Sequence, residues 1–409
     1  MAKEYKDLVV GLDIGTAKVM VVVAEVLPGG ELKLAGLGVA PSNGIKRGVV
    51  VNIDATVASI QQALKEAELM ADCKITRVYT GITGSHIRGI NSSGMVAIKD
   101  RDVSSADVAR VVETAKAINI STDQRLLLVE PQEFIIDGQD VKEPIGMSGI
   151  RLEAKVHIVT GAQSAAENII KCVRRCGLEV EQLMLNPLAS SLSVLTQDER
   201  ELGVALVDIG AGTTDVAIFT NGAIRHTAVI PIAGDLITSD IAMALRTPTK
   251  DAEDIKVESG HAKQMLVDPQ VQVEVPGLGD RGPRMLSRQA LAGVIEPRVE
   301  EIFSLVNQVM RDSGYEEVLS SGIVLTGGSC IMPGMVELGE DIFLKPVRRG
   351  VPKYSSALAD MVAQPRAATV MGLLEEARMA RMRGYKVAQK NGSMKTALGS
   401  IKDWFIGNF

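Results

Sequence analysis

The sequence predicts an α/β protein of two related lobes, with a small α+β domain inserted in the first lobe and a C-terminal amphipathic helix. Three observations predict this fold. They are a repeated glycine-rich turn between apolar runs, a series of short extended runs around one helix over residues 83–162, and an apolar stripe at the C-terminus behind a basic segment. With 409 residues, 46% of them hydrophobic, the chain is long enough for several domain cores.

The two glycine turns share one pattern, in which an apolar run is followed by aspartate, isoleucine and glycine. The first reads Leu8-Val9-Val10-Gly11-Leu12-Asp13-Ile14-Gly15-Thr16 and precedes the apolar run 19–23. The second ends Asp208-Ile209-Gly210-Ala211-Gly212-Thr213-Thr214-Asp215 and precedes the apolar run 216–219. Apolar, β-branched runs on both sides of glycine predict a strand, a tight turn and a second strand. The repetition therefore predicts two related lobes that face each other.

These turns have the residues that are needed to bind a nucleoside triphosphate and its magnesium ion. Backbone N–H groups in a glycine turn bind phosphate oxygens, and aspartate suits Mg²⁺. A third run, 323–326, is also followed directly by glycine. One such turn alone is as well explained by a plain β-turn, but three together favour a phosphate site. The candidate residues are Asp13, Gly15, Thr16, Lys18, Asp208, Gly210, Gly212, Thr213, Thr214, Gly327, Gly328 and Ser329. Asp13 and Asp208 are the candidate Mg²⁺ ligands, through water, because a bare carboxylate repels phosphate.

Composition excludes several other classes of protein. The net charge of −6 argues against a general nucleic-acid binder. Four cysteines without a signal peptide indicate a reducing, cytosolic setting, and Cys172 and Cys176 are expected to be core residues of one helix face. No apolar stretch approaches the ~20 residues that a transmembrane helix requires.

The remaining pattern predicts an ordered series of elements. In the first half we expect strands within residues 5–40, helix 54–70, strand 75–82, helix 105–118 capped by Ser104 or Ser105, helix 164–175, strand 180–185 and helix 187–195. In the second half we expect helices 235–245, 249–260, 287–312 and 367–383, a Pro/Gly-rich loop over 271–284, and a polar linker over 385–393.

The C-terminus is predicted to be a membrane anchor that lies on the bilayer surface. Residues 378–409 hold seven Lys or Arg against one acid, a net charge of +6, which leaves −12 on the first 377 residues. The apolar stripe is Met394, Leu398, Ile401, Trp404, Phe405 and Phe409. Such a stripe beside a basic segment gives two cooperating signals for an anionic membrane. The alternative is a helix docked on the protein's own core, which the basic linker and the terminal aromatic residues disfavour.

Five segments resemble the signature elements of the actin-like ATPase superfamily, which arrive here in the same order. They are residues 11–23, 183–190, 205–219, 322–328 and 365–373. Within this superfamily the chain resembles the FtsA family of bacterial cell-division proteins over residues 5–409, because of the insert, the stretch 283–298 and the tail.

The resemblance implies duplicated ribonuclease-H-like domains with defined limits. The first core lobe would comprise 1–82 and 163–203, and the insert 83–162. The second core lobe would comprise 204–233 and 310–377, and its small domain 234–309. Residues 378–392 would form a basic linker and residues 393–409 the membrane-targeting helix.

The same resemblance implies ligands and partners. Gly234 would approach the phosphates, and Glu253 and Lys256 would reach ribose and adenine of ATP. Arg284, Arg288 and Arg298 would receive the C-terminal peptide of FtsZ, the tubulin-like ring protein, since guanidinium suits carboxylate. The family also implies protofilaments of the chain itself, recruitment of later division proteins, and a peripheral position on the cytoplasmic face of the inner membrane at the division site.

Hydrolysis of ATP is expected to be weak or negligible. Related proteins often carry Glu or Gln where this chain has Asn186, and a short neutral amide cannot act as a base. We therefore expect a scaffold protein and at most a weak ATPase. Two alternatives remain, a small-metabolite kinase of the same superfold and a shape-determining or pilus actin-like protein. A DnaK-type chaperone is excluded, because too few residues follow the core for a peptide-binding domain.

Overall fold

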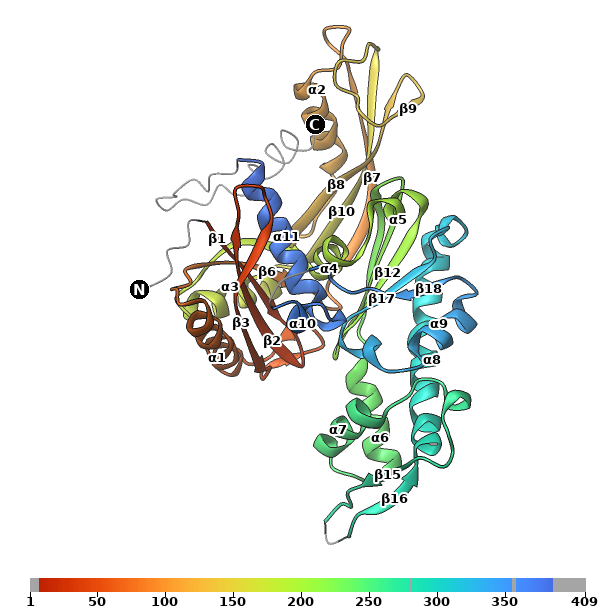
Figure 1. Cartoon of the computed structure of the whole chain (residues 1–409). Coiled ribbons are helices and arrows are strands. Elements are labelled where there is room, and N and C mark those ends of the chain that lie inside the picture. The colour runs from red at the N-terminus through yellow and green to blue at the C-terminus, as the bar shows by residue number, and fades with distance from the viewer. Residues whose placement is uncertain (1–6, 280, 355–357, 385–409) are drawn as a thin grey trace.

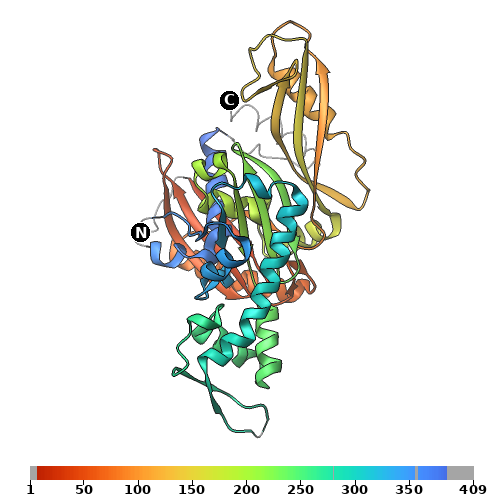
Figure 2. The same cartoon turned by 90° about the vertical axis from the view of Figure 1, so that its right-hand side faces the viewer.

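The structure is a computed structural model that describes residues 7–279, 281–354 and 358–384. Two lobes, each built on a five-stranded sheet, occupy the middle of the molecule (Figure 1). The inserted domain extends from one end, and a small subdomain of the second lobe extends from the opposite end (Figures 1 and 2). The predicted division into two lobes and an insert is therefore confirmed.

The sheet of the first lobe has the strand order β11-β6-β1-β2-β3. These strands are β1 (Leu8–Ile14), β2 (Lys18–Val26), β3 (Leu32–Pro41), β6 (Arg77–Ile82) and β11 (Glu179–Leu185), and the short hairpin β4 (Ile45–Lys46) and β5 (Val49–Val50) follows β3. Helices α1 (Ile53–Ala71) and α3 (Gln163–Arg175) cover one face, where Val21 is buried, and α11 (Ala368–Met382) covers the other, where Val22 is buried. Because helices cover both faces, the central strands β1 and β2 are apolar along most of their length.

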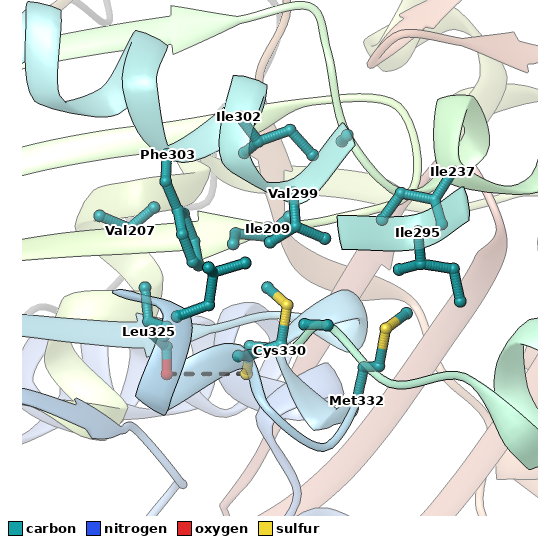
Figure 3. Packing of buried hydrophobic residues seen from close by; sticks show 14 of the residues in the cluster. Val207, Ile209, Ile237, Ile295, Val299, Ile302, Phe303, Leu325, Cys330 and Met332 are labelled. Carbon is teal, nitrogen blue, oxygen red and sulfur yellow. Dashed lines mark hydrogen bonds between the residues drawn. The ribbon is translucent and has the colours of Figure 1, made fainter. Parts of the chain in front are cut away.

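The sheet of the second lobe has the order β14-β13-β12-β17-β18. Its strands are β12 (Val204–Ile209), β13 (Thr214–Thr220), β14 (Ala223–Ile230), β17 (Ile323–Thr326) and β18 (Val347–Arg349). One face packs on the long helix α8 (Arg288–Ser313), where Phe303 lies beside Val207 and Leu325 (Figure 3). The other face meets α4 (Asn186–Val194) and the start of α11, so these two helices lie between the sheets.

The two sheets repeat one topology. In each, the glycine turn joins an antiparallel pair, with Asp13 opposite Met20 in β1–β2 and Asp208 opposite Asp215 in β12–β13. In each, the first strand of that pair also runs parallel to a later strand, β6 or β17. The repeated sequence pattern thus reflects a duplicated domain.

The insert is a four-stranded antiparallel sheet with one helix against it. It consists of β7 (Arg88–Ala97), α2 (Ser105–Lys116), β8 (Gln124–Ile136), β9 (Gln139–Val141) and β10 (Arg151–Ala162), in the sheet order β7-β10-β8-β9. Ser104 caps α2 in a reciprocal arrangement, in which Asp107 accepts a 3.0 Å hydrogen bond from the Ser104 N–H. This helix and its cap were predicted from the sequence.

The small subdomain of the second lobe is built around α6 (Gly234–Leu245), α7 (Thr249–Ser259), the 3₁₀ turn η1 (Gln264–Leu266) and the first part of α8. The prediction of a continuous loop over residues 271–284 is wrong. Strands β15 (Gln272–Val275) and β16 (Arg284–Ser287) pair there, because Val273 and Val275 alternate into the core while the prolines and glycines lie between the strands.

The C-terminal part of the described chain returns to the first lobe. Helix α11 packs on β1, β2, β6 and α4, so residues 368–377, assigned to the second lobe from sequence, lie against the first. The helix continues to Met382, so the predicted linker 378–392 begins within it. The remaining elements are α5 (Gln197–Leu202), η2 (Glu316–Val318), η3 (Gly328–Ile331), α9 (Met335–Phe343), α10 (Ala359–Val362) and η4 (Pro365–Ala367).

The predicted membrane helix 393–409, with Met394, Leu398, Ile401, Trp404, Phe405 and Phe409, lies outside the described residues. Within the part that is described, no helix has the length and apolarity to cross a bilayer.

Candidate functional site at the seam between the lobes

The two glycine turns have the same backbone geometry and meet across the seam. The Gly15 N–H donates to the Lys18 carbonyl at 3.0 Å, and the Gly210 N–H donates to the Thr213 carbonyl at 2.9 Å. A Cβ on Gly212 would lie 2.6 Å from the Thr16 hydroxyl oxygen, so the turns touch. The hydroxyl of Thr214, by contrast, is bound to the Ile232 carbonyl at 2.8 Å.

The two predicted magnesium ligands lie on opposite lobes, near enough for the charge of Asp13 to act on Asp208. Asp13 is buried and lies 3.3 Å from the ammonium of Lys18. Asp208 accepts hydrogen bonds from Ser190 at 2.6 Å and from Thr369 at 3.4 Å. Burial, and then the negative charge of Asp13, raise the pKa of Asp208 to about 6. A divalent cation between the two carboxylates would relieve this unfavourable charge.

Asp215 is a third buried carboxylate at this seam, which the sequence analysis did not select. It sits opposite Asp208 on the neighbouring strand and accepts hydrogen bonds from Thr83, the residue after β6, and, at 3.2 Å, from Thr213. Burial and the charge of Asp208 raise the pKa of Asp215 to about 7. Its position directly after Thr213 and Thr214 was the signal that could have identified it.

The second turn is surrounded by glycines, at positions where a side chain would clash with neighbouring atoms. The Gly234 N–H donates to the Gly210 carbonyl at 3.2 Å, and the Ser329 hydroxyl donates to the same carbonyl at 2.8 Å. Gly327 has a positive φ of 88°, and a Cβ there would lie 2.4 Å from a carboxylate oxygen of Asp208. Gly328 follows it as the first residue of η3. Only glycine fits so close to the carboxylate, which is the arrangement that a phosphate cradle needs.

Glu253 and Lys256 lie on α7 and contact residues of α6 in the same region. The ammonium of Lys256 is buried and donates to the Gly234 carbonyl at 3.2 Å, to Thr238 at 2.8 Å and to Glu253 at 2.6 Å. The pair therefore borders the predicted phosphate glycine rather than forming an unrelated surface ion pair.

Asn186 is the first residue of α4, one helical turn before Ser190. Its side-chain oxygen is buried and has no hydrogen-bond partner among the described residues. A Cβ on Gly81 would lie 2.1 Å from that oxygen, so the space around the amide is narrow. An amide in this position cannot take a proton from water.

The three predicted partner arginines all lie in the small subdomain, on β16 and α8. Arg284 donates to the Leu245 carbonyl, and Arg288 donates to the Ser259 carbonyl at 2.8 Å. Arg298 makes a two-pronged contact with Asp240 at 2.5 and 3.0 Å and also pairs with Glu301. Arg298 therefore already has carboxylate partners within the chain.

Comparisons with known proteins agree with this geometry. A family profile described as "Cell division protein FtsA" matches residues 205–372, and one described as "SHS2 domain inserted in FTSA" matches residues 84–160. Among solved structures, the PilM–PilN type IV pilus biogenesis complex has a TM-score of 0.65 at 17% identity and covers 90% of this chain and 98% of its own. MreB5 of Spiroplasma citri bound to ADP has a TM-score of 0.58 at 15% identity, with coverage of 94% and 99%. These likenesses show the actin-like fold.

Likeness in sequence extends over nearly the whole chain. It is 54% identical over 409 residues to the cell division protein FtsA of Pseudomonas aeruginosa, with 98% of each chain covered. It is 50% identical to FtsA of Neisseria meningitidis, covering 97% of this chain and 98% of that one, and 45% identical to FtsA of Escherichia coli, covering 99% of each. With the two aspartate turns and the insert in their predicted places, this shows that the chain belongs to the FtsA family of bacterial cell-division proteins.

Proposed function

We propose that this chain is an ATP-binding scaffold that tethers FtsZ polymers to the cytoplasmic face of the inner membrane at the division site. It would also recruit later division proteins and assemble into actin-like protofilaments. The observation that carries the proposal is the meeting of Asp13 and Asp208 at one glycine-lined seam, in a chain that is FtsA-like over nearly its full length.

The seam is where we assign ATP and Mg²⁺. Asp13 and Asp208 would hold the ion, and the turns at Gly15 and Gly212 would offer N–H groups to phosphate oxygens. When bound, Mg²⁺ supplies the positive charge that lets carboxylates and phosphates approach. The glycines whose added Cβ would strike Asp208 or Ser329 support this fit. Solved MreB5 structures with a similar fold carry ADP and AMPPNP, which supports a nucleotide here.

We expect the bound nucleotide to shape the two lobes rather than to drive chemistry. Asn186 stands where related proteins place a residue that orients water, and its amide offers no base. ATP turnover should therefore be slow, and closure of the lobes on ATP would present a defined surface to partners. A metabolite kinase would instead need an acid or base at this point.

Membrane attachment and FtsZ binding are assigned to two separate surfaces. Residues 393–409 would lie on the bilayer through Trp404 and Phe405, with the basic linker beside anionic lipid. The small subdomain around Arg284, Arg288 and Arg298 would receive the FtsZ C-terminal peptide. Since Arg298 already pairs with Asp240, a peptide carboxylate would have to compete there, whereas Arg284 lies exposed.

Co-sedimentation on lipid vesicles tests the proposal. The purified chain, FtsZ and phosphatidylglycerol-containing vesicles are mixed with Mg·ATP and centrifuged. FtsZ should pellet with vesicles only when the chain is present, and a chain lacking residues 393–409 should leave FtsZ in the supernatant. Equal FtsZ in the pellet with and without the chain would contradict the tether, and rapid phosphorylation of a small metabolite would favour a kinase.

A further inference from the structure

The insert contacts both lobes, although its chain interrupts only the first. The chain enters it after β6 and leaves it through β10 into α3. At its base, Ile87 and Val159 are buried in the hydrophobic core of the first lobe. Hydrophobic contact of this kind is non-directional.

A directional, partly buried ion pair ties the insert to the second lobe. Arg225 of edge strand β14 is 3% exposed and donates to Glu133 of β8 at 2.6 Å. Lys155 of β10 donates to the other oxygen of Glu133 at 2.9 Å. Burial raises the pKa of the Glu133 carboxyl, but the hydrogen bonds from Lys155 and Arg225 bring it below its ordinary value. Glu133 is thus held as a charged link between the two domains.

A second polar contact lies beside the ion pair. The ring of His157, which is 1% exposed, lies 2.6 Å from the Asn91 amide oxygen and 3.0 Å from the Thr227 hydroxyl of β14. The Asn91 amide also donates to the Arg225 carbonyl at 3.1 Å, and Gln132 donates to the Ile224 carbonyl at 2.9 Å. Side chains of β7, β8 and β10 therefore bind to β14 and cover this edge strand of the second-lobe sheet.

A third contact connects the insert to the candidate nucleotide site. Thr83, at the end of β6, donates a hydrogen bond to Asp215, which faces Asp208 across the β12–β13 pair. The next residue, Gly84, has a φ of 135°, which favours glycine, and leads the chain into the insert. The Thr83 hydroxyl therefore links the β12–β13 pair to the point where the chain enters the insert.

We propose that the insert moves with the second lobe and pivots on the first when the lobes close on a nucleotide. Because hydrogen bonds require a definite distance and angle whereas apolar contacts are non-directional, the network at Arg225 stays intact and the rotation occurs where the chain enters the insert, at Gly84. The proposal rests on ATP binding at the seam, as assigned above. It makes the orientation of the insert relative to the first lobe dependent on the nucleotide.

Distances between spin labels in the full-length chain test this coupling. Labels at Lys74→Cys in the first lobe, Glu317→Cys in the second and Glu113→Cys in the insert occupy exposed sites, with half-buried Cys73 and Cys176 replaced by serine and the two buried cysteines kept. On addition of Mg·ATP, the distance between 74 and 113 should shift while the distance between 317 and 113 stays constant. An unchanged 74–113 distance in protein that binds ATP would overturn the proposal.

A matched pair of variants identifies the contact that transmits the motion. Arg225→Met removes the buried guanidinium but leaves Glu133 paired with Lys155, and should abolish the shift or broaden the distance distribution. Lys142→Met removes an equal charge from an exposed pair that the insert makes with Glu201 of α5, at 3.1 Å, and should keep the wild-type shift. A wild-type shift in Arg225→Met overturns the role of the network. Parallel titration with a fluorescent ATP analogue distinguishes failure of the coupling from failure of the nucleotide site. If the wild type does not bind the analogue, the nucleotide site itself is refuted.

Discussion

Ser190 of helix α4 donates a 2.6 Å hydrogen bond to Asp208 of strand β12, and both side chains are buried. Thr369 of α11 lies 3.4 Å from the same carboxylate oxygen. Both helices also pack on the first-lobe sheet. The layer between the lobes therefore positions the second-lobe aspartate, so that a disturbance of this layer reaches the candidate metal ligand.

The stability of the nucleotide-free protein should respond to the titration of Asp208 and Asp215. Their folded pKa values of about 6 and about 7 exceed the unfolded value of about 4. The folded state thus binds protons more tightly, and the stability from these groups is complete below pH ~4 and lost as the pH rises through 7. We predict that Asp215→Asn raises the melting temperature relative to the wild type, by an amount that grows from pH 4.5 to 7.5.

Differential scanning fluorimetry without nucleotide measures this difference. Asp254→Asn, at an exposed position of α7, serves as the control for removal of one carboxylate. A gap between Asp215→Asn and wild type that stays constant over this pH range would contradict the assignment. Addition of Mg·ATP should narrow the gap, because cation binding stabilises the ionised carboxylates.

Asp208→Ala should weaken Mg²⁺-dependent ATP binding by about tenfold or more, since it removes a charged ligand from a desolvated site. Equilibrium titration with a fluorescent ATP analogue, with and without Mg²⁺, gives the affinities. Asp240→Ala changes a carboxylate bound to Arg298 in the small subdomain and controls for loss of charge. Unchanged affinity in Asp208→Ala would mean that the site lies elsewhere.

The sequence predicted the local parts of this site well, and the reason is physical. A strand, glycine turn and strand are encoded within about a dozen residues, so Asp13 and Asp208 were found directly. Contacts between the lobes are not encoded locally. Thr83 and Asp215 are 132 positions apart, and His157 and Thr227 are 70 apart. Their pairing depends on how the sheets sit against each other, which hydrophobic periodicity does not describe.

The short strands β15 and β16 were missed for a different reason. Prolines and glycines dominate residues 276–283, and they masked the alternation of Val273 and Val275 at one end. The sequence analysis assigned residues 368–377 to the second lobe, although they pack against the first. The sequence pattern of a helix that is buried between two sheets does not indicate to which lobe the helix belongs.

Asn186→Ala should leave ATP turnover unchanged from that of the wild type, which we expect to be slow. The buried amide oxygen has no hydrogen-bond partner among the described residues, so truncation removes an unsatisfied group and should change the melting temperature little. Phosphate release under single-turnover conditions checks the rate. A fall in turnover of more than about tenfold, or 1.4 kcal/mol in barrier, would show that the amide does orient water.

Trp404→Glu should abolish sedimentation of the chain with anionic vesicles while leaving ATP binding unchanged. A buried aromatic side chain contributes about 1.5–3 kcal/mol, and a carboxylate in its place adds the cost of burying a charge. Trp404→Phe is the matched control and should retain sedimentation. Full sedimentation of Trp404→Glu would contradict the assignment of residues 393–409 as the anchor.

Gly372→Ala should destabilise the protein and weaken ATP binding at the same time. Helix α11 crosses α4 so closely that a Cβ on Gly372 would lie 1.7 Å from the Ala189 carbonyl oxygen, so the added methyl must push the helices apart. Overpacking of this kind costs about 1–3 kcal/mol, and it displaces Ser190, the residue next to Ala189, from Asp208. Gly29→Ala, whose Cβ would have no heavy atom within 4 Å, makes the same change in the unfolded chain and should leave stability unchanged or raise it by up to about 1 kcal/mol. Denaturant unfolding and ATP titration of both variants check this, and loss of stability in Gly372→Ala with normal ATP affinity would show that the helix layer does not position Asp208.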